Sequence, residues 1–356
     1  MTIDDIKNVI NDRPLTKIKP SVSTGSTMLN LACSDDPFAG FMQGSYYLLV
    51  GDSSSGKTFL SMTCFAEACL NDEFKDHRLI YDDVENGCLM DVERFFGTQV
   101  KERLEAPKYD NEGLPEHSTK VEEFYYNIHN AIEEGKPFIY VLDSMDGLSS
   151  ESEQEKFNEQ KAAFEKGKTT AGSYGDGKAK KNSENLRKIM SDLKRTNSIL
   201  IIISQTRDNL GMGFEKKTRS GGKALRFYAT NEIWTSVAGK INKTVDGTPR
   251  HIGNYIKAQI RKNRTSGWSN DVKLSIYPSY GIDDVGSCID YLIEEGHWKK
   301  SKQSYIVPEF DFEGRRETLI DYIEENNKIK ELREITGQVW NETKEKCSLK
   351  RKKRYE

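Results

Sequence analysis

The segment Gly51-Asp52-Ser53-Ser54-Ser55-Gly56-Lys57-Thr58 constrains the fold of this chain more than any other feature. It matches the pattern G-x-x-x-x-G-K-[ST] at every fixed position, and a loop of such small residues lets consecutive backbone N–H groups surround a phosphate. An apolar run at 46–50 precedes the loop and predicts a buried strand, and residues 59–66 predict a helix after it. The helix would direct the positive end of its dipole at the same anion. The segment therefore predicts a site for a nucleoside triphosphate.

Two further positions extend this site to a metal ion. Lys57 is expected to reach the β- and γ-phosphates, and the Thr58 hydroxyl is expected to ligate Mg²⁺. The apolar run at 138–144 predicts a strand that ends in Asp143, which we expect to hold the same ion through a water molecule. A buried strand that ends in aspartate is common, but one that follows a phosphate loop strongly indicates this role.

Length and composition set the outer limits. A chain of 356 residues is long enough for one large α/β domain with small appendages. No run of eighteen apolar residues occurs and the first residues lack a signal-peptide pattern, so we expect a cytoplasmic protein with no membrane partner. The cysteines show no metal-ligand spacing. The net charge of −3 argues neither for nor against nucleic acid, because the position of the positive charge matters more than its sum.

Alternating strands and helices predict a mainly parallel sheet that is covered on both faces, because the strands are near-continuous runs of Ile, Leu and Val. We expect strands at 78–82, 124–128, 138–144 and 198–204, a short helix that ends at Gly135, a helix at 183–195 and irregular structure at 98–123. The acidic turn 82–87 follows the first of these strands at the edge where open α/β sheets bind ligands. A solvated turn is the alternative interpretation of these acidic residues.

Two segments differ from the rest in composition. Residues 166–181 contain four glycines and five lysines against one aspartate, which predicts a mobile basic loop rather than a packed element. Residues 206–220 carry four cations against two anions, and Leu210 and Phe214 stand isolated among polar residues and glycines. Apolar side chains in such a loop indicate contact with a partner. A polyanion would suit both segments, and a surface insertion is the alternative for the first.

Residues 204–229 resemble the second DNA-binding loop and following helix of RecA-type recombinases. Residues 23–26, the phosphate loop and Asp143-Ser144 recur in the order found in that family, as do residues 262–264, Tyr277 and residues 281–282. The resemblance covers about residues 20–295. The turn at 83–87 and the length of the chain look most like phage strand-exchange proteins of the UvsX type.

The resemblance implies a role for each matched residue. Glu85 would be the general base that orients the attacking water, and Gln205 would sense the γ-phosphate. Lys262 and Arg264 would reach the ATP of the neighbouring subunit, and Tyr277 would lie near the adenine. The first DNA loop, about 151–182, is longer and richer in lysine than the family pattern. The DNA-binding residues implied in this loop, in the second loop at 206–220 and just after it are Lys178, Lys180, Lys181, Arg207, Leu210, Gly211, Met212, Phe214, Lys216, Lys217, Arg219, Gly221 and Gly222.

The resemblance also implies a domain order. Apolar residues at 3, 6, 9 and 10 predict a short helix at 3–10, which would dock on its own domain or on a neighbouring subunit. On the resemblance, residues 1–20 would hold a polymerisation helix and linker, residues 21–295 a RecA-like ATPase core with a mainly parallel sheet, and residues 296–356 a small extension. Bacterial relatives finish in an acidic tail, whereas residues 344–354 carry seven cations against one anion. These cations are either a solvated charge run or an accessory DNA contact.

The implied function is that of an ATP-dependent DNA recombinase, a DNA-dependent ATPase that uses ATP and Mg²⁺. It would form a helical filament on single-stranded DNA, hold ATP at the subunit interface and exchange strands with double-stranded DNA. A single-strand-binding protein and a loader are further expected partners, and the expected compartment is a bacterial or phage-infected cytoplasm. The alternatives are a ring-forming helicase-like motor on the same core and an ATP-binding, DNA-binding paralogue without strand exchange.

Overall fold

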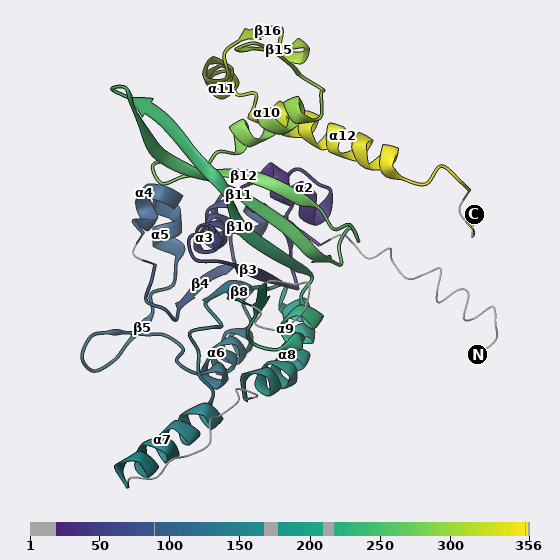
Figure 1. Ribbon diagram of the computed structural model, residues 1–356. Coiled ribbons are helices and arrows are strands. Elements are labelled where there is room, and N and C mark those ends of the chain that lie inside the picture. The colour runs from purple at the N-terminus through teal and green to yellow at the C-terminus, as the bar shows by residue number, and fades with distance from the viewer. Residues whose placement is uncertain (1–18, 89, 167–176, 209–216, 353, 355–356) are drawn as a thin grey trace, which may run out of the picture.

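A nine-stranded mixed sheet forms the centre of the computed structural model, which describes residues 19–88, 90–166, 177–208, 217–352 and 354 (Figure 1). The helix predicted at 3–10 and the loop positions Leu210, Gly211, Met212, Phe214 and Lys216 lie outside the described residues. The mixed α/β architecture confirms the fold class predicted from the alternation of strands and helices.

The predicted parallel sheet is confirmed in one half of this nine-stranded sheet. Its parallel neighbours, in spatial order, are β10 (Asn231–Val245), β3 (Ser45–Gly51), β8 (Ile199–Asp208), β7 (Phe138–Asp143) and β4 (Arg78–Asp83). The other half is antiparallel, with β10 pairing to β11 and β8 pairing to β9. The four strands of the nine-stranded sheet outside its parallel half are β9 (Lys217–Arg219), β11 (Thr248–Asn263), β12 (Asp271–Tyr277) and β13 (Gly281–Ile282). The long β10–β11 hairpin, which extends beyond the body in Figure 1, is not predicted from the sequence.

The two faces of the sheet bury alternate residues of the same strands. On β3, Tyr47 and Leu49 face one hydrophobic cluster, and Tyr46, Leu48 and Val50 face the other. This alternation explains the unbroken apolar run, because a strand buried on both faces needs no polar side. Helices α2 (Thr27–Ser34) and α3 (Lys57–Cys69) cover the first face, and α6 (Val121–Glu133) and α8 (Gly177–Thr196) cover the second.

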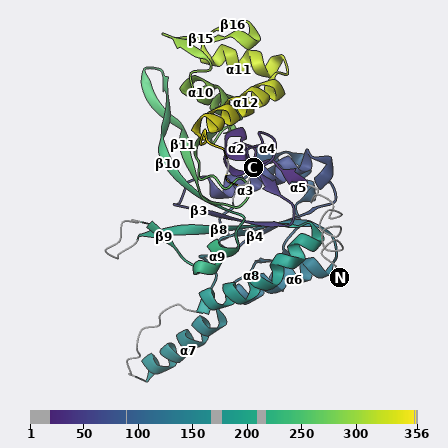
Figure 2. The same ribbon diagram turned by 90° about the vertical axis from the view of Figure 1, so that its right-hand side faces the viewer.

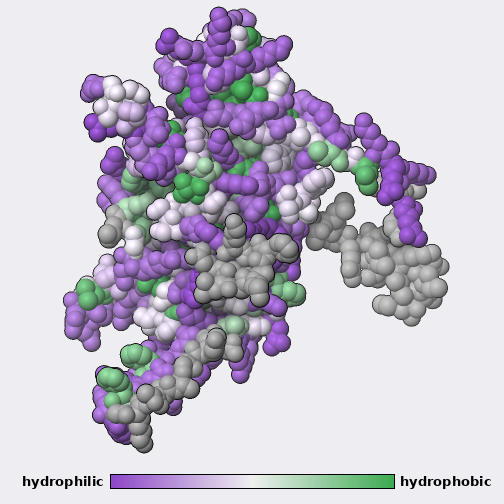
Figure 3. Space-filling view, in the orientation of Figure 1, coloured by the Kyte–Doolittle hydropathy of each residue, from purple (hydrophilic) through white to green (hydrophobic). Residues whose placement is uncertain are grey.

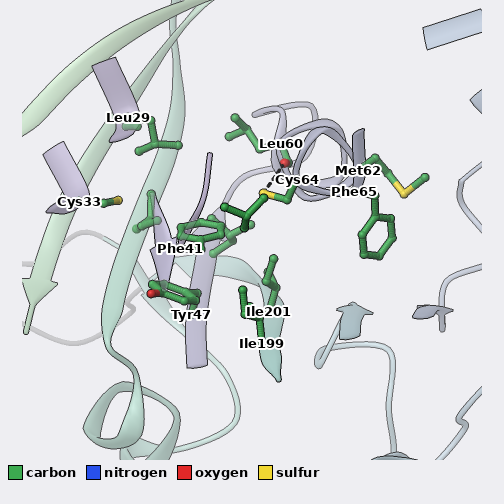
Figure 4. Close-up of a cluster of buried hydrophobic side chains, with 14 of the residues drawn as sticks. Leu29, Cys33, Phe41, Tyr47, Leu60, Met62, Cys64, Phe65, Ile199 and Ile201 are labelled. Atoms are coloured by element: carbon green, nitrogen blue, oxygen red, sulfur yellow. Dashed lines mark hydrogen bonds between the residues drawn. The ribbon is translucent and has the colours of Figure 1, made fainter. Parts of the chain in front are cut away.

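The first cluster fixes the helix that follows the phosphate loop. Figure 4 shows side chains of α2, α3 and β8 gathered around Phe41 and Tyr47, whose rings stack with centroids 4.1 Å apart. Phe41 comes from β2 (Phe41–Met42), which pairs with β1 (Ser21–Val22). The cluster therefore holds α3 against β3 and positions the loop between them.

The strand predicted at 124–128 is wrong, because these residues lie within α6. Phe124 and Ile128 are one helical turn apart and both are fully buried, with further buried positions at 121, 125, 131 and 132. That spacing is typical of a helix. A short apolar run alone does not distinguish a helix from a strand. The region 98–123 is also more regular than expected. Short elements here and just before it are η1 (Asp72–Phe74), α4 (Val92–Phe96), α5 (Thr98–Arg103), β5 (Lys108–Tyr109) and β6 (Pro115–Glu116).

The first predicted DNA loop contains more helix than its composition indicates. Its acidic part forms α7 (Glu151–Glu165), which begins with a capping box between Ser150 and Glu153 and has no buried residue. Its last lysines belong to the first turns of α8. Figures 1 and 2 both show α7 projecting away from the body of the molecule. Residues 167–176 lie outside the described residues, so the predicted mobile loop is tested only at its ends.

The C-terminal part packs around a third hydrophobic cluster, centred on residues such as Trp298 and Leu319. The chain turns between its last two helices at Asn327, whose φ is 54°. The face in Figure 3 is mostly hydrophilic. Across the described residues, no helix is both long and apolar enough to cross a membrane. The elements that follow β9 and β13 are α9 (Lys223–Tyr228), α10 (Asp284–Glu294), β14 (Lys299–Ser301), β15 (Ser304–Val307), η2 (Pro308–Phe310), β16 (Phe312–Gly314), α11 (Arg316–Glu325) and α12 (Ile329–Cys347).

Candidate functional site

The phosphate loop joins the buried end of β3 to the first residue of α3, as the sequence predicts. Gly56 has a φ of 82°, and a Cβ added there would lie 2.9 Å from Cδ1 of Ile276. Both the conformation and the close approach require glycine at this position. Gly51, Asp52, Ser53, Ser54 and Ser55 complete the turn ahead of it, and the N-terminus of α3 opens at this loop, where an anion is stabilised.

Lys57 is buried, with 8% of its surface exposed, and its ammonium turns back over the loop. Its Nζ donates to the carbonyl oxygens of Gly51 at 3.0 Å and Asp52 at 2.7 Å. Burial lowers the pKa of Lys57, although the carboxylates of Asp143 and Glu85 oppose this effect. A phosphate anion at this loop would favour the charged amine in the same way.

Thr58 and Asp143 meet as predicted, with the hydroxyl donating to the carboxylate at 2.5 Å. The hydroxyl of Tyr81 donates to the same oxygen at 2.9 Å. Burial raises the pKa of Asp143, and these two hydrogen bonds oppose the shift. Among the described residues there is no cluster of three or more His, Cys, Asp or Glu side chains able to hold a metal. One hydroxyl and one carboxylate nevertheless fit Mg²⁺, which usually takes one or two protein oxygens and completes its shell with phosphates and waters.

Glu85, in the turn after β4, and Gln205, on β8, meet at the same edge of the sheet. Gln205 follows the apolar part of β8, and its Nε2 donates to Oε1 of Glu85 at 2.8 Å. Ser144, directly after β7, donates to the same oxygen at 2.5 Å. Both contacts arise because the carboxyl ends of parallel strands share one edge. The edge therefore combines a buried lysine, a hydroxyl–carboxylate pair and a carboxylate–amide pair.

Asp146 is a residue of this edge that the sequence does not predict. Its carboxylate accepts hydrogen bonds from the Ser204 hydroxyl at 2.9 Å, from the backbone N–H of Gln205 at 2.7 Å and from the Ser220 hydroxyl. Arg207 lies 3.7 Å from it. Asp146 thus fixes the position of Gln205. It lies outside both the phosphate-loop pattern and the strand that ends in Asp143, so no sequence signal points to it.

Lys262 and Arg264 do not lie in the phosphate loop but line a basic cavity of about 690 Å³. Lys262 donates to the carbonyl oxygens of Arg226 at 2.6 Å and Phe227 at 2.7 Å, and Arg264 donates to that of Phe227 at 2.7 Å. Burial, together with the positive charge of Arg264, lowers the pKa of Lys262 to about 8. Glu232 is the single carboxylate among the described residues that line the cavity, against the cations Lys217, Arg219, Lys223, Arg226, Arg261, Lys262 and Arg264.

The predicted DNA-binding cations differ in their exposure and in whether a carboxylate of the protein already pairs with them. Lys217 pairs with Asp52 and stays 44% exposed, and Arg207 is exposed. Arg219 is 9% exposed and pairs with the buried Glu232 at 3.0 Å. Its assignment to DNA stays a prediction, and this ion pair stands against it.

The remaining predicted site residues are the lysines at the start of α8, the two glycines before α9 and the tyrosine at the end of β12. Lys178 and Lys181 make contacts within the protein, to the Asp146 carbonyl at 3.4 Å and to Glu122 at 3.3 Å, whereas Lys180 is exposed. Gly221 and Gly222 both have a φ of 80°. A Cβ at Gly222 would lie 2.6 Å from that of Ala179, so backbone geometry alone explains this glycine. Tyr277 ends β12 and packs close to Gly253 on the neighbouring strand, and its place near an adenine stays a prediction.

Comparison with known proteins gives a consistent result. Residues 139–283 match the family model described as the RecA N-terminal domain. Protein RecA of Chloroherpeton thalassium is 29% identical over 79% of this chain and 70% of its own length. Protein RecA of Cytophaga hutchinsonii is 27% identical over 83% of this chain and 77% of its own length. Protein RecA of Thioalkalivibrio sulfidiphilus is 26% identical over 93% of this chain and 85% of its own length.

Proposed function

The chain is a RecA-type recombinase, and from this premise we propose that it forms a filament on single-stranded DNA, hydrolyses ATP at the subunit interface and exchanges homologous strands. The observation that carries the proposal is the meeting of Glu85 with Gln205 beside the Thr58–Asp143 pair. These contacts bring a candidate base, a candidate phosphate sensor and candidate Mg²⁺ ligands to one edge of the sheet. The relatives from Chloroherpeton, Cytophaga and Thioalkalivibrio are all RecA proteins, so neither the ring motor nor the inactive paralogue is favoured.

Each residue of the edge has a defined task in this proposal. Lys57 and the backbone of the phosphate loop hold the phosphates, while Thr58 and Asp143 hold Mg²⁺. Mg²⁺, when bound, neutralises negative charge on the phosphates. Glu85 accepts a proton from the attacking water. An amide nitrogen carries two donors, so Gln205 can hold Glu85 and also donate to a phosphate oxygen.

The basic cavity supports a role for the neighbouring subunit. Lys262 and Arg264 lie side by side there, and a neighbour's phosphates would replace the Phe227 carbonyl as their acceptor. Cations that arrive only when a neighbour docks would make hydrolysis depend on filament formation. Arg207 and Lys217, on the stem of the second DNA loop, are the described cations proposed to contact the DNA backbone. The likeness to phage proteins of the UvsX type, the single-strand-binding partner and the loader remain proposals.

The test is ATP turnover with and without a single-stranded oligonucleotide. Glu85→Gln is expected to bind ATP but to lose on the order of 10²-fold in turnover, the scale of losing a general base. Lys57→Ala is expected to lose nucleotide binding itself, because the cation at the phosphates is gone. Glu116→Gln and Lys75→Ala, at exposed positions of β6 and next to η1, are the matched controls. Normal turnover by Glu85→Gln would show that the base is another residue.

Mixing variants tests the shared site. Lys262→Ala should lose most DNA-stimulated turnover while the separate subunit keeps its affinity for nucleotide. A mixture with Lys57→Ala should recover part of the activity, since some interfaces then combine an intact loop with intact cations. If the two variants assemble together and no mixture recovers activity, the cations act within their own subunit.

A further inference from the structure

Asp52, the second residue of the phosphate loop, turns its side chain toward the β8–β9 hairpin. One carboxylate oxygen accepts a hydrogen bond from the hydroxyl of Thr206, and the other pairs with the ammonium of Lys217. Thr206 stands opposite Arg219 and Lys217 stands opposite Asp208 in the ladder, so Thr206 and Lys217 lie on the same face of the hairpin. A single carboxylate therefore contacts both strands that lead into the second predicted DNA loop.

The backbone of the same residue contacts the phosphate-binding lysine. The carbonyl oxygen of Asp52 accepts from Lys57 Nζ at 2.7 Å and from the Ser55 hydroxyl at 2.8 Å. A phosphate in the loop needs the donors of Lys57, so it competes with this carbonyl for the ammonium. Asp52 is thus joined to the nucleotide site by its backbone and to the DNA hairpin by its side chain.

The charges around Asp52 determine which of its contacts a bound phosphate or DNA would weaken. A carboxylate beside a phosphate site is repelled by the bound anion, so a nucleotide favours displacement of the Asp52 side chain from the position in which it pairs with Lys217. The ion pair with Lys217, followed by the hydrogen bond from Thr206, lowers the pKa of Asp52, so the side chain stays charged at neutral pH. Lys217 cannot donate fully to a DNA phosphate while Asp52 holds it. DNA and Asp52 therefore compete for one lysine, just as phosphate and the Asp52 carbonyl compete for another.

We propose that Asp52 is a positioning residue that couples nucleotide binding to DNA binding. It holds Lys217 through the ion pair, and nucleotide binding at Lys57 shifts the loop and releases Lys217 to the DNA backbone. The inference rests on the proposed function and adds a connection separate from the Gln205–Glu85 pair. It assigns to Asp52 a restraint on DNA binding that the phosphate-loop pattern does not require, because the pattern leaves this position open.

Fluorescence anisotropy of a labelled oligo(dT), titrated with salt and without nucleotide, tests the restraint. Asp271→Asn is the matched control, because Asp271 pairs with Lys257 at 2.6 Å and is 44% exposed, against 40% for Asp52. The free energy of one exposed ion pair corresponds to a change of about 2- to 5-fold in binding affinity. Asp52→Asn is therefore expected to bind DNA about 2- to 5-fold more tightly than Asp271→Asn. Its plot of log affinity against log salt should steepen by up to about 0.7, the share of one phosphate contact.

A non-hydrolysable ATP analogue and a second substitution complete the experiment. Coupling is reciprocal, so the analogue should enhance DNA binding less in Asp52→Asn than in the wild-type protein. The enhancement should be smaller by the same factor by which Asp52→Asn binds DNA more tightly without nucleotide. Lys217→Met should cost more affinity in the Asp52→Asn background than in the wild type, which a merely structural role of Asp52 would not produce.

Two results would overturn the inference. If Asp52→Asn and Asp271→Asn bind DNA alike while the wild type still responds to the analogue, the coupling role of Asp52 is refuted and the proposed function stands. If the wild-type protein itself binds DNA no more tightly with the analogue, the proposed function fails and the inference fails with it.

Discussion

Replacing Glu232 with glutamine is expected to destabilise the protein strongly, because its carboxylate is buried between two guanidinium groups. Glu232 is 1% exposed and lies on β10, and its oxygens are 3.0 Å from Nε of Arg219 and 3.1 Å from Nε of Arg226. Glutamine keeps the shape and one acceptor oxygen but removes the charge. Arg219, at 9% exposure, then remains as a buried and uncompensated cation.

The magnitude follows from the unequal exposure of the two arginines. Breaking a buried pair by neutralising one partner costs about 3–5 kcal/mol. Arg226 is 55% exposed and regains water when its partner is neutralised, so the lower end, about 3 kcal/mol, applies. At roughly 2 °C per kcal/mol for a large domain, the thermal midpoint should fall by roughly 6 °C.

Thermal unfolding followed by circular dichroism measures this shift. Glu93→Gln is the matched control, because it makes the same chemical change in an exposed pair, where Glu93 is 47% exposed and 2.5 Å from Lys101. That variant should unfold at the wild-type temperature, since exposed ion pairs contribute little. A midpoint for Glu232→Gln that coincides with that of Glu93→Gln would refute the assignment of a structural buried ion pair to Arg219.

Two further predictions concern the charged groups of the site. Lys262 has a pKa of about 8, so about half of its amine is neutral at pH 8, and an acylating reagent followed by peptide mass spectrometry should label it ahead of exposed lysines. Between this value and the ordinary 10.5, Lys262 binds more protons in the unfolded chain, so it contributes a rise in stability with pH that opposes the fall from buried cysteines and tyrosines with raised pKa values. Lys262→Met should therefore make stability fall more steeply with pH across that window, and equal slopes for variant and wild type would contradict the lowered pKa. Asp143 is expected to carry the Mg²⁺ dependence of nucleotide binding, so chelation with EDTA should weaken binding in the wild type but change it little in Asp143→Asn. An unchanged EDTA effect in Asp143→Asn would place the metal elsewhere.

The phosphate loop is predictable because its determinants are consecutive in the chain. A glycine at a positive φ, a lysine, a hydroxyl residue and a flanking strand and helix all lie within a short segment. The meeting of Thr58 with Asp143 and of Glu85 with Gln205 is predictable for another reason. Parallel strands bring their carboxyl ends to one edge, so residues far apart in sequence become neighbours once each strand is recognised.

Other features depend on contacts that no local pattern reveals. In the sequence, Arg219 has the features of a DNA-binding cation. In the structure, the carboxylate of Glu232 on β10 neutralises its charge within the protein. Asp146 joins β8 to the residues after β9 because its carboxylate accepts from the backbone N–H of Gln205 and from the Ser220 hydroxyl. Only the end of the helix at 121–133 is predicted, as the short helix expected to end at Gly135. Its first part is missed because the run from Phe124 to Ile128 is apolar enough for either structure, and only its packing against α8 and the sheet decides.

The β10–β11 hairpin escapes prediction for a related reason. Its outer part, residues 242–251, is exposed on both faces and alternates polar with apolar residues only weakly, so it lacks the pattern of a half-buried strand. Its inner part, by contrast, is anchored by parallel pairing of Asn231 to Thr235 with β3. Tertiary pairing, rather than local preference, sets its length.

Strand exchange between a circular single-stranded DNA and a homologous linear duplex tests the central claim most directly. The wild-type protein is expected to form joint molecules with ATP and Mg²⁺, and Lys57→Ala is expected to form none under the same conditions. Joint molecules that appear equally with and without nucleotide, or a wild-type protein that hydrolyses ATP on DNA but never pairs homologous strands, would contradict it.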